Sequence, residues 1–507
     1  MIRPQAALDS GMQEGRLRRW PGSKRTATEE IIRDAGVTVG RCRDAIRNTP
    51  WGRKAVDTWS CAVIGTGIKP SPRLDNKTAR ERLLEDWRDW TDESDADGRT
   101  DFYGQQRLAA RELMAAGEAF FRRRWRRPQD GLVVPFQIQC IASEQLPVWL
   151  TGPSETVGAT GSPAGNQIRA GIEFDAIGRR TAYHFLRLHP GDAAYRLGEV
   201  RSVASAPDQL VRVPAEDVIH VYDTEEPGQI RGMPRMAAGI VRLYEADRFI
   251  DAQQARQHMA SCVAIVVEPP ADGVPAFAQQ PPAASAEDAL NDSGDRNIQD
   301  IELAPGTLIE LRPGETWKPL APPQLAGEFD PFMYRVACDV AVAFGIPYLG
   351  LTGDASKADY SSERASQVRW WREVEPIQHQ TIVHQLCRPV WRWFIDAGLV
   401  GGTLRLPGYA RNPRRYLRLD WIAHKWEWVD PLKDMQARDL QMKAGIISRE
   451  HVQDEMGLDP QQEDESIAAS QARAKELGLK IGADAMVPET PPEEPGDDEE
   501  EPEDDGA

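Results

Sequence analysis

The chain has 507 residues, 41% of them hydrophobic, and a formal net charge of −18 at pH 7. Twelve acidic residues and no basic ones lie in 484–507, which leaves only −6 for the rest of the chain. This charge balance excludes a protein built around one broad basic surface for nucleic acid. The length predicts two or more packed regions, and the lack of a run of about 18 apolar residues predicts no membrane partner.

The N-terminal part is predicted to be a polar arm followed by helices. Residues 1–27 carry a basic cluster and few apolar side chains, so we expect a flexible arm. Apolar residues at helical spacing predict three helices, over 28–47, 77–91 and 101–116. Pro50 can open another helix, and Val63, Ile64 and Ile68 among glycines predict a strand after it.

Two β-hairpins are expected next, and the first of them carries a run of arginines. EAFFRRRWRR and LVVPFQIQCI flank the turn PQDG, whereas IRAGIEFD and RTAYHFLRL flank a turn at Gly178. VPAEDVIHVY is expected to form one short strand. Because side chains alternate along a strand, Arg122, Arg124 and Arg126 are predicted to share one face. Such a row suits contact with phosphates; the alternative is a solvated or intersubunit rim of the hairpin.

The central region is predicted to contain two helices around a loose connection. Residues 233–262 fit one long helix with Pro234 in its first turn, and at 1.5 Å per residue it would span about 45 Å. A monomer of this size has little to pack along such a helix, so we expect neighbouring copies of the same helix as partners. Residues 269–300 are expected to form a loose loop, 301–315 short strands, and 328–345 a second helix.

The C-terminal part is predicted to contain a loop, a long helix and several short helices. The glycine-containing segment 349–360 is expected to be a loop. Residues 361–397 predict a very long helix that Pro376 kinks. Residues 428–480 are expected to form short helices, and the acid-rich residues 481–507 a disordered tail.

No motif of a catalytic or metal site is found. The chain lacks G-x-x-x-x-G-K-[ST], G-x-S-x-G and H-E-x-x-H. The acidic run 93–98 begins like a calcium loop, but Gly104 stands where a bidentate glutamate belongs, so we interpret it as a turn between two helices. Six scattered cysteines without a C-x-x-C pair are expected to be reduced. We therefore expect no catalytic residue, cofactor or metal.

Four segments together resemble the lambda-type portal protein family of tailed phages. They are RNTPWGRKAVDTWSCAVIGTGIKP, VPAEDVIHVYDTEEPGQIRGMPRMA, VAVAFGIPYLGLTGDASKADYSSERAS and WVDPLKDMQARDLQMKAGIISREHVQDEMGLDP. The third is the most specific, because a helix ending in G-I-P, a loop and then Y-S-S-x-R recurs in this family. The resemblance covers residues 30–480, and Glu363 departs from it where the family often has a small residue.

The resemblance implies an α+β portal fold that assembles into a ring. Its parts would be a wing of helices and β-hairpins (28–232), a stem helix (233–262), a small clip with short strands (263–327), a second stem helix (328–345), a channel loop (346–360), a long kinked helix with further wing strands (361–427) and a helical crown (428–480).

The resemblance also implies a non-enzymatic function in the virion. Such subunits form a ring of roughly twelve copies at one capsid vertex, after assembly in the host cytoplasm, and double-stranded DNA passes through the ring during packaging and ejection. The expected partners are other copies, the DNA duplex, the terminase large subunit, a head-completion or neck protein, and the major capsid or scaffolding protein. The loop residues expected to face DNA are Thr352, Gly353, Asp354, Ser356 and Lys357.

Two other functions stay open from the sequence. A DNA-processing, metal-dependent hydrolase would need clustered carboxylates, and metal-dependent nicking of plasmid DNA would favour it. A structural protein of the capsid or neck without a channel would give assemblies that lack a central hole in particle images.

Overall fold

The computed structural model describes residues 24–155, 161–192, 210–261, 265–268, 316–319, 329–356, 359–423, 431–456, 458 and 460–479. The chain divides into two compact units: residues 1–68 with 72–424, and residues 69–71 with 425–507. Both helices and strands are present, as the α+β class predicts. No helix within the described ranges is long and apolar enough to cross a membrane.

Four helices begin the first unit, and a polar side chain caps each of them. They are α1 (Ala27–Asn48), α2 (Pro50–Ile64), α3 (Lys77–Glu93) and α4 (Phe102–Ala115). The capping side chains, which accept a hydrogen bond from the backbone of the first turn, are those of Thr26, Thr49, Asn76 and Asp101. The helices predicted at 28–47, 77–91 and 101–116 are confirmed.

The strand predicted around Val63 and Ile64 is wrong. Both residues lie in the last turn of α2 and are buried, and the helix ends at Gly65, whose φ is 58°. Packing of the α2 face that includes Trp59 outweighs the preference of β-branched residues for strands. A short strand, β1 (Lys69–Pro72), follows the helix instead.

A three-stranded antiparallel sheet forms the centre of the first unit. Its order is β3 (Phe136–Ile141), β2 (Glu118–Trp125) and β9 (Val218–Tyr222). The β2–β3 hairpin is the first predicted hairpin, and its connection contains a 3₁₀ turn at Pro128–Asp130. The single strand predicted over 213–222 is wrong, because a 3₁₀ turn at Ala215–Asp217 divides it between two sheets.

A five-stranded antiparallel sheet packs on one face of this sheet. Its order is β4 (Gly152–Pro153), β5 (Gln167–Arg169), β6 (Ile172–Phe174), β7 (Arg180–Leu186) and β8 (Leu210–Pro214). The second predicted hairpin is present as β6–β7, but its first arm is split, because Ala170 and Gly171 both have positive φ and separate β5 from β6. Apolar residues of both sheets, including Phe120, form one buried cluster.

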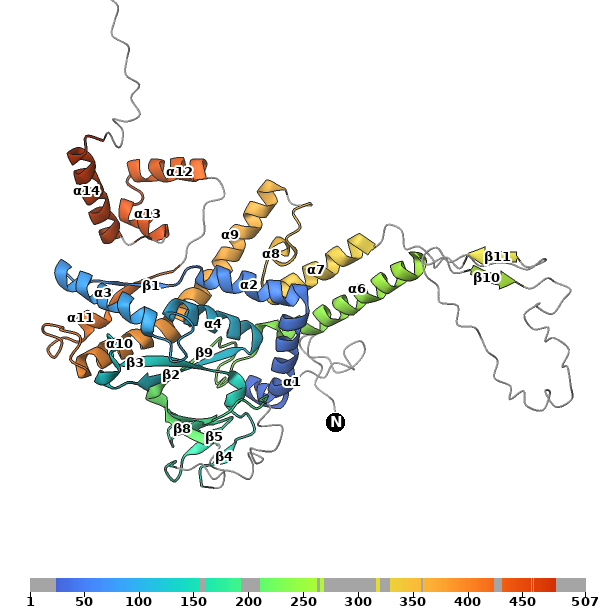
Figure 1. Ribbon diagram of the computed structural model, residues 1–507, viewed down its shortest axis with the longest axis horizontal. Coiled ribbons are helices and arrows are strands. Elements are labelled where there is room, and N and C mark those ends of the chain that lie inside the picture. The colour runs from blue at the N-terminus through green and yellow to red at the C-terminus, as the bar shows by residue number, and fades with distance from the viewer. Residues whose placement is uncertain are drawn as a thin grey trace, which may run out of the picture. The chain divides into compact units, whose positions relative to one another are not determined.

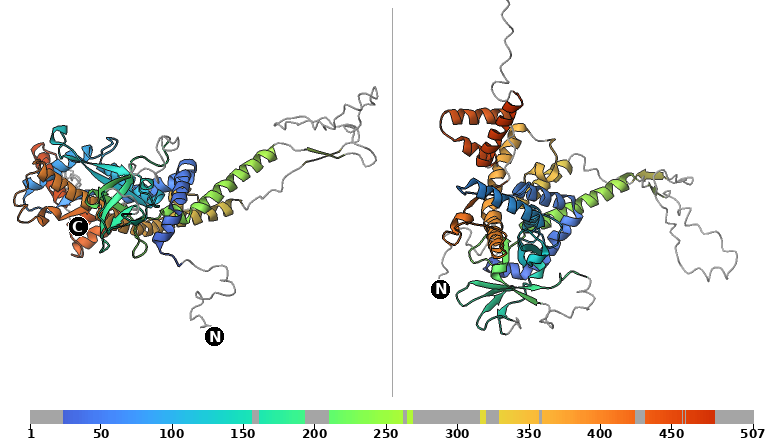
Figure 2. Two further views of the ribbon diagram at one scale, coloured as in Figure 1. Left: turned by 90° about the horizontal axis from the view of Figure 1, so that it is seen from below. Right: turned by 60° about the vertical axis from the view of Figure 1, so that its left-hand side comes forward.

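Helices cover the other face of the three-stranded sheet, as Figures 1 and 2 show. Trp87 of α3 is the centre of an aromatic cluster there. Its ring centroid lies 5.0 Å from Trp90, 5.5 Å from Phe102 of α4, and 5.0 Å from Trp391 and 5.1 Å from Phe394 of α10 (Arg388–Val400). This cluster fixes three helices of different sequence position against one another.

The helix predicted at 233–262 begins later than expected. The helix α6 spans Ile240–Ser261, and a 3₁₀ turn at Arg235–Ala238 precedes it. Pro234 therefore starts a separate turn rather than the long helix. The second predicted helix is confirmed as α7 (Phe329–Phe344), and α6 and α7 lie side by side in both views of the first unit (Figures 1 and 2).

Two short strands lie in the part of the chain between α6 and α7. They are β10 (Ile265–Glu268) and β11 (Thr316–Pro319), and they pair in antiparallel fashion. The loose loop predicted at 269–300 and the strands predicted at 301–315 lie outside the described residues. The arm predicted at 1–27 is described only from residue 24, and the tail predicted at 481–507 lies outside the described residues as well.

The segment after α7 is more helical than expected. A short helix, α8 (Tyr348–Thr352), occupies the start of the predicted loop 349–360, which is corrected to that extent. The predicted long helix is α9 (Tyr360–Pro376) and α10, joined without a break by the π-helical segment η11 (Ile377–Cys387). Pro376 has no N–H to donate, and the change of helical geometry begins directly after it.

The remaining elements of the first unit are short: α11 (Arg414–Leu417) and the strand β12 (Leu419–Ile422). In its described part the second unit contains three helices, α12 (Pro431–Lys443), α13 (Arg449–Glu455) and α14 (Pro460–Glu476). The prediction of short helices within 428–480 is confirmed. Their role as a crown, like the other portal regions, stays a prediction.

Candidate functional site: the helix pair α6 and α7

A close approach at Gly239 fixes the base of the helix pair. A Cβ atom on Gly239 would lie 2.6 Å from the ring of Phe344 and 2.8 Å from the Cβ of Ala343, so the end of α7 touches the backbone just before α6. Met236 in the 3₁₀ turn before α6 and Leu243 in the first turn of α6 are both buried. The two helices therefore leave their base antiparallel and in contact.

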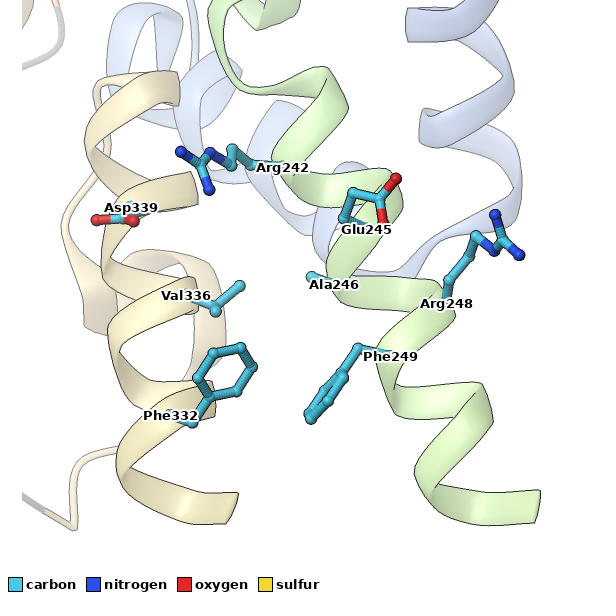
Figure 3. A pocket seen from close by; sticks show the side chains of 8 residues that line it. All are labelled: Arg242, Glu245, Ala246, Arg248, Phe249, Phe332, Val336 and Asp339. Atoms are coloured by element: carbon cyan, nitrogen blue, oxygen red, sulfur yellow. The ribbon is translucent and has the colours of Figure 1, made fainter. Parts of the chain in front are cut away.

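Farther from the base the pair opens into a groove. Phe249 of α6 lies 4.9 Å from Phe332 and 6.0 Å from Phe329 of α7, measured between ring centroids. Figure 3 shows that Phe249 and Ala246 point toward Phe332 and Val336 across the groove. The charged residues Arg242, Glu245, Arg248 and Asp339 complete its lining, and Arg248 extends from the side of α6 away from α7. The space between these side chains is about 490 Å³. Half of the Phe332 side chain is exposed (50%).

The outer sides of the pair also expose apolar side chains. Val241 is 61% exposed and Tyr244 57% exposed on α6, and Val342 is 80% exposed on α7. Single exposed apolar residues are common on protein surfaces, but here they accompany a groove whose walls are aromatic. The helix pair therefore offers apolar surface on more than one side.

The predicted channel-loop residues follow this pair, and three of them are tied to ordered structure. Thr352 is the last residue of α8, Gly353 follows with φ of 73°, and Asp354 accepts a hydrogen bond from the hydroxyl of Tyr348 (3.1 Å). The hydroxyl of Thr58 on α2 donates to the carbonyl oxygen of Gly350 (2.9 Å) and holds α8 against α2. The first part of the predicted loop is thus anchored.

Ser356, farther along the predicted loop, has fewer contacts than its start. Ser356 is exposed, and its backbone N–H donates to the Asp354 carboxylate (2.9 Å). Lys357 lies outside the described residues. The contact of these residues with a duplex stays a prediction.

The arginines of the first hairpin are divided between the two faces of β2. Arg123 forms an ion pair with Asp217 (2.8 Å), and its guanidinium lies 4.6 Å from the ring centroid of Trp125. Arg126 donates to the side-chain oxygen of Gln137 (2.7 Å). The strand geometry confirms that Arg122 and Arg124 share a face, whereas their contact with phosphate stays a prediction.

A buried ion cluster that the sequence did not reveal connects the sheets to the start of α6. The carboxylate of Glu118 accepts hydrogen bonds from Arg231 Nε (2.9 Å), Ser143 Oγ (2.6 Å) and the backbone N–H of Gly232 (3.0 Å), and His220 Nε2 lies 3.0 Å from it. Both Glu118 and Arg231 are only 2% exposed. A charged residue inside an apolar run such as EAFF is the signal that could have indicated such a buried site.

The cluster shifts the pKa of two of its members downward. Burial favours neutral Glu118, but the charge of Arg231 and the hydrogen bond from His220 outweigh burial and hold the pKa of Glu118 below its ordinary value. Burial lowers the pKa of His220 to about 4, against the opposing attraction of Glu118. At neutral pH the cluster therefore holds a carboxylate, a guanidinium and a neutral imidazole.

The backbone also crosses itself closely at this point. A Cβ atom on Gly232 would lie 2.0 Å from the carbonyl oxygen of Gly117, and one on Gly117 would lie 2.2 Å from the backbone of Met233. Gly117 has φ of 83°, which glycine adopts at little cost. The chain leading to α6 is thus pressed against the start of β2.

A second buried cluster resembles a hydrolytic triad in composition only. Glu173 Oε2 accepts from Ser162 Oγ (2.7 Å) and lies 3.0 Å from His184 Nε2. The serine hydroxyl is also nearest to that same nitrogen (3.5 Å), whereas a triad needs the acid and the serine on opposite nitrogens of the ring. Arg212 pairs with both carboxylate oxygens, so the cluster holds the five-stranded sheet together.

The acidic run 93–98 forms a turn, as predicted. The carboxylate of Asp95 accepts from the backbone N–H groups of Asp97, Arg99 and Thr100 and from the side chain of Gln105. Within the described ranges, no group of three or more His, Cys, Asp or Glu side chains is placed to hold a metal ion.

Comparison with known families decides the identity of the chain. Residues 13–378 match the family model described as phage portal protein, lambda family. The chain belongs to the lambda family of phage portal proteins. This family assignment covers the three-stranded and five-stranded sheets, the α6–α7 pair, α9 and the first two residues of η11.

Similar proteins agree with the portal family. The chain is 26% identical over 344 residues to a "Probable portal protein" of Halomonas phage phiHAP-1, covering 68% of this chain and 61% of that protein. It therefore spans less than two thirds of the length of this relative.

Solved structures also resemble the portal chain. A chain from the neck of a native gene transfer agent particle is 14% identical, with 84% of this chain and 94% of that chain covered and a TM-score of 0.47. An HK97 family phage portal protein from Corynebacterium diphtheriae is 11% identical, with 65% and 84% covered and a TM-score of 0.31.

Proposed function

We propose that this portal protein forms a closed ring of roughly twelve copies around a channel for double-stranded DNA at one vertex of the phage head. The observation that carries this proposal is the apolar surface on several sides of the α6–α7 pair. A ring uses one head-to-tail interface that repeats until it closes, so each copy must present two different matching surfaces. The groove lined by Phe249 and Phe332, and the outer side with Val241 and Tyr244, supply two such surfaces.

Burial of these side chains between copies would stabilise the ring. Full burial of one Val, Leu or Phe side chain contributes about 1.5–3 kcal/mol, and each copy exposes several apolar side chains on this pair. An interface of this kind gives a pair of long helices the packing partner that one chain lacks.

The channel loop is proposed to follow the helix pair into the channel. Thr352, Gly353, Asp354, Ser356 and Lys357 would meet DNA through shape and charge, without reading its sequence. Anchoring of α8 by Thr58 supports a loop whose start is fixed. A channel must not grip its cargo, because several phosphate contacts bind strongly at low salt and would slow translocation.

The remaining partners are proposed from the family. The segment between α6 and α7 would dock the terminase large subunit during packaging and a head-completion or neck protein afterwards. The outer sheets would face the major capsid or scaffolding protein. The assembled ring would reside in the virion after assembly in the host cytoplasm.

The ring proposal is tested by imaging the purified protein. Wild type should give rings with a central hole in negative-stain images and the mass of an oligomer in light scattering. Val241→Asp combined with Tyr244→Asp should give monomers with an unchanged circular dichroism spectrum, because buried unpaired carboxylates disfavour the interface.

A matched control is Val37→Asp on α1, where a valine is 60% exposed on a helix of the same unit. This variant should still form rings. Wild-type protein that stays monomeric at every concentration and salt tried contradicts the proposal, as do rings in the double variant that equal those of wild type.

A further inference from the structure

The two faces of β2 differ in whether their arginines have partners. On one face Arg123 is held by Asp217 and lies over Trp125 and, at 5.2 Å, over the ring of Trp393. On the other face Arg122 and Arg124 are half-buried, and neither side chain forms a hydrogen bond or ion pair with a residue that the structure describes. The first face is closed by the fold itself, whereas the second holds two cations that are bonded to no carboxylate among the described residues, although Asp217 attracts Arg122.

The neighbours of these two arginines on β3 are neutral amides. Gln139 lies opposite Arg122 and Gln137 lies opposite Arg124, and directly opposite residues of an antiparallel pair share a face. Gln137 accepts from Arg126 (2.7 Å), which places that arginine at the outer end of the same row. We call the row Arg122, Arg124 and Arg126 the arginine ladder.

The ladder is electrostatically unfavourable when empty. Burial lowers the pKa of Arg122, and the like charge of Arg124 lowers it further. Asp217 attracts Arg122 at longer range, but its carboxylate is bonded to Arg123. An anion bound beside the ladder would remove the repulsion between the two guanidinium groups.

The spacing of the ladder fits a second extended chain. Alternate side chains along a strand are spaced about 6.6–6.8 Å apart, and those of any other extended segment have the same spacing. A guanidinium group binds a carboxylate through two parallel hydrogen bonds, which a lysine cannot do. Carboxylates on every second residue of an extended segment would therefore meet successive arginines.

We propose that the arginine ladder binds an extended acidic segment of a protein partner, with carboxylates on alternate residues. A polypeptide fits better than a DNA duplex, because the ladder is a single row with the acidic Asp217 nearby, whereas duplex-binding surfaces are broad and basic. This site goes beyond the ring and its channel, since it lies on the β2–β3 hairpin and not on the α6–α7 pair.

The test measures binding of a synthetic peptide to the full-length protein. The probe is a fluorescent peptide of about ten residues in which serine and glutamate alternate, and its partner probe has glutamine in place of glutamate. Fluorescence anisotropy at low salt should show binding of the glutamate peptide only. Arg122→Gln with Arg124→Gln should weaken that binding by at least about tenfold, which corresponds to 1.4 kcal/mol.

The matched control is Arg127→Gln, which removes an arginine that is exposed just beyond the end of β2. Its affinity for the glutamate peptide should stay within about twofold of the wild-type affinity. The double variant should keep a melting temperature close to that of wild type, because neither side chain it removes forms a hydrogen bond or ion pair with a described residue, and the attraction of Asp217 is offset by the repulsion between the two arginines. Rings in electron micrographs should be equal for all variants, which separates this test from that of the ring.

Three outcomes would overturn the inference. The first is equal binding of the glutamate peptide by the double variant and by Arg127→Gln. The second is equal binding of the glutamine peptide by wild type. The third is ladder-dependent binding of a short DNA duplex in place of the peptide, which would assign the ladder to phosphates.

Discussion

At the scale of single residues, the Glu118 cluster determines how the sheets join the chain that enters α6. Glu118 lies on β2, His220 on β9, and Arg231 just before the turn that precedes α6. Loss of one partner from a buried ion pair costs about 3–5 kcal/mol, because the other charge stays buried without compensation. The cluster thus makes the position of Arg231 nearly obligatory in the folded state.

Acidification should weaken the protein through this cluster. The pKa of His220 is about 4 in the folded state, below its ordinary value, so the unfolded state takes up the proton first as pH falls. Its Nδ1 has no hydrogen-bond partner in the described part of the chain, and a proton there would be buried unpaired. We expect the free energy of unfolding to be about 2 kcal/mol lower at roughly pH 5 than at roughly pH 7.5 from this residue.

Urea unfolding at both pH values measures the effect. His220→Gln should lose this part of the pH dependence, while the fall in stability from Glu118 at still lower pH should remain, because its folded pKa also lies below the ordinary value. An equal pH dependence in wild type and variant would contradict the assignment.

The residue-scale network could be predicted from the sequence only in part. Glu118 after Gly117 and His220 in VIHVY are polar residues inside apolar strands, which indicates buried partners. Arg231 is 113 residues from Glu118 along the chain, and no local pattern connects the two. The same holds for Glu173 and Arg212, because ion pairs between strands depend on sheet order rather than on spacing.

At the scale of elements, Gly239 limits how closely α6 and α7 can pack. Its φ is −106°, which alanine also adopts, so any effect of Gly239→Ala comes from the contacts of the added methyl group with Phe344 and Ala343. The added methyl group would lie 2.6 Å from that ring, and overpacking of this kind costs about 1–3 kcal/mol. We expect a lower melting temperature for this variant.

Gly36→Ala is the matched control for this prediction. Gly36 lies within α1, and a Cβ atom there meets nothing within 4 Å, so the substitution should stabilise by about 0.5–1 kcal/mol. Thermal unfolding of both variants should give changes of opposite sign. A stabilising Gly239→Ala would mean that the helix pair separates at its base.

Elements with strong local signals were predictable, and those decided by packing were not. Apolar residues at helical spacing predict α1, α3 and α4 within two residues. Val63 and Ile64 were assigned to a strand because their preference for strands is a weak signal that burial in α2 overrides. The start of α6 was placed too early because Pro234 suits the first turn of a helix and of a 3₁₀ turn equally well.

At the scale of the whole molecule, the chain should behave as two folding units. The buried aromatic cluster around Trp87 and the cluster between the two sheets are both formed by residues of the first unit. Domains that contain their own hydrophobic core fold alone. The division of the chain, expected from its length, is confirmed, whereas the boundary near residue 424 was not marked by a distinct sequence signal.

A chain shortened to residues 1–423 tests this independence. It should keep a cooperative thermal transition within about 3 °C of the main transition of the full chain, as measured by circular dichroism. Circular dichroism spectra of the shortened and full chains that match per residue in the β-sheet signal would support independent folding of the first unit. A shortened chain that melts without cooperativity would show that the first unit needs the rest of the chain.

The crossing of Gly117 and Gly232 has a mechanical consequence. A loose connection between α6 and the sheets would absorb a displacement of α6. Here the two backbones touch, and the carboxylate of Glu118 joins them by accepting a hydrogen bond from the backbone N–H of Gly232. A force on α6 is therefore transmitted directly to β2. The short turn between Pro234 and Gly239 is the first place where the chain can bend. A force that pulls on the far end of the helix pair would act on the sheets before the chain between α6 and β2 had extended.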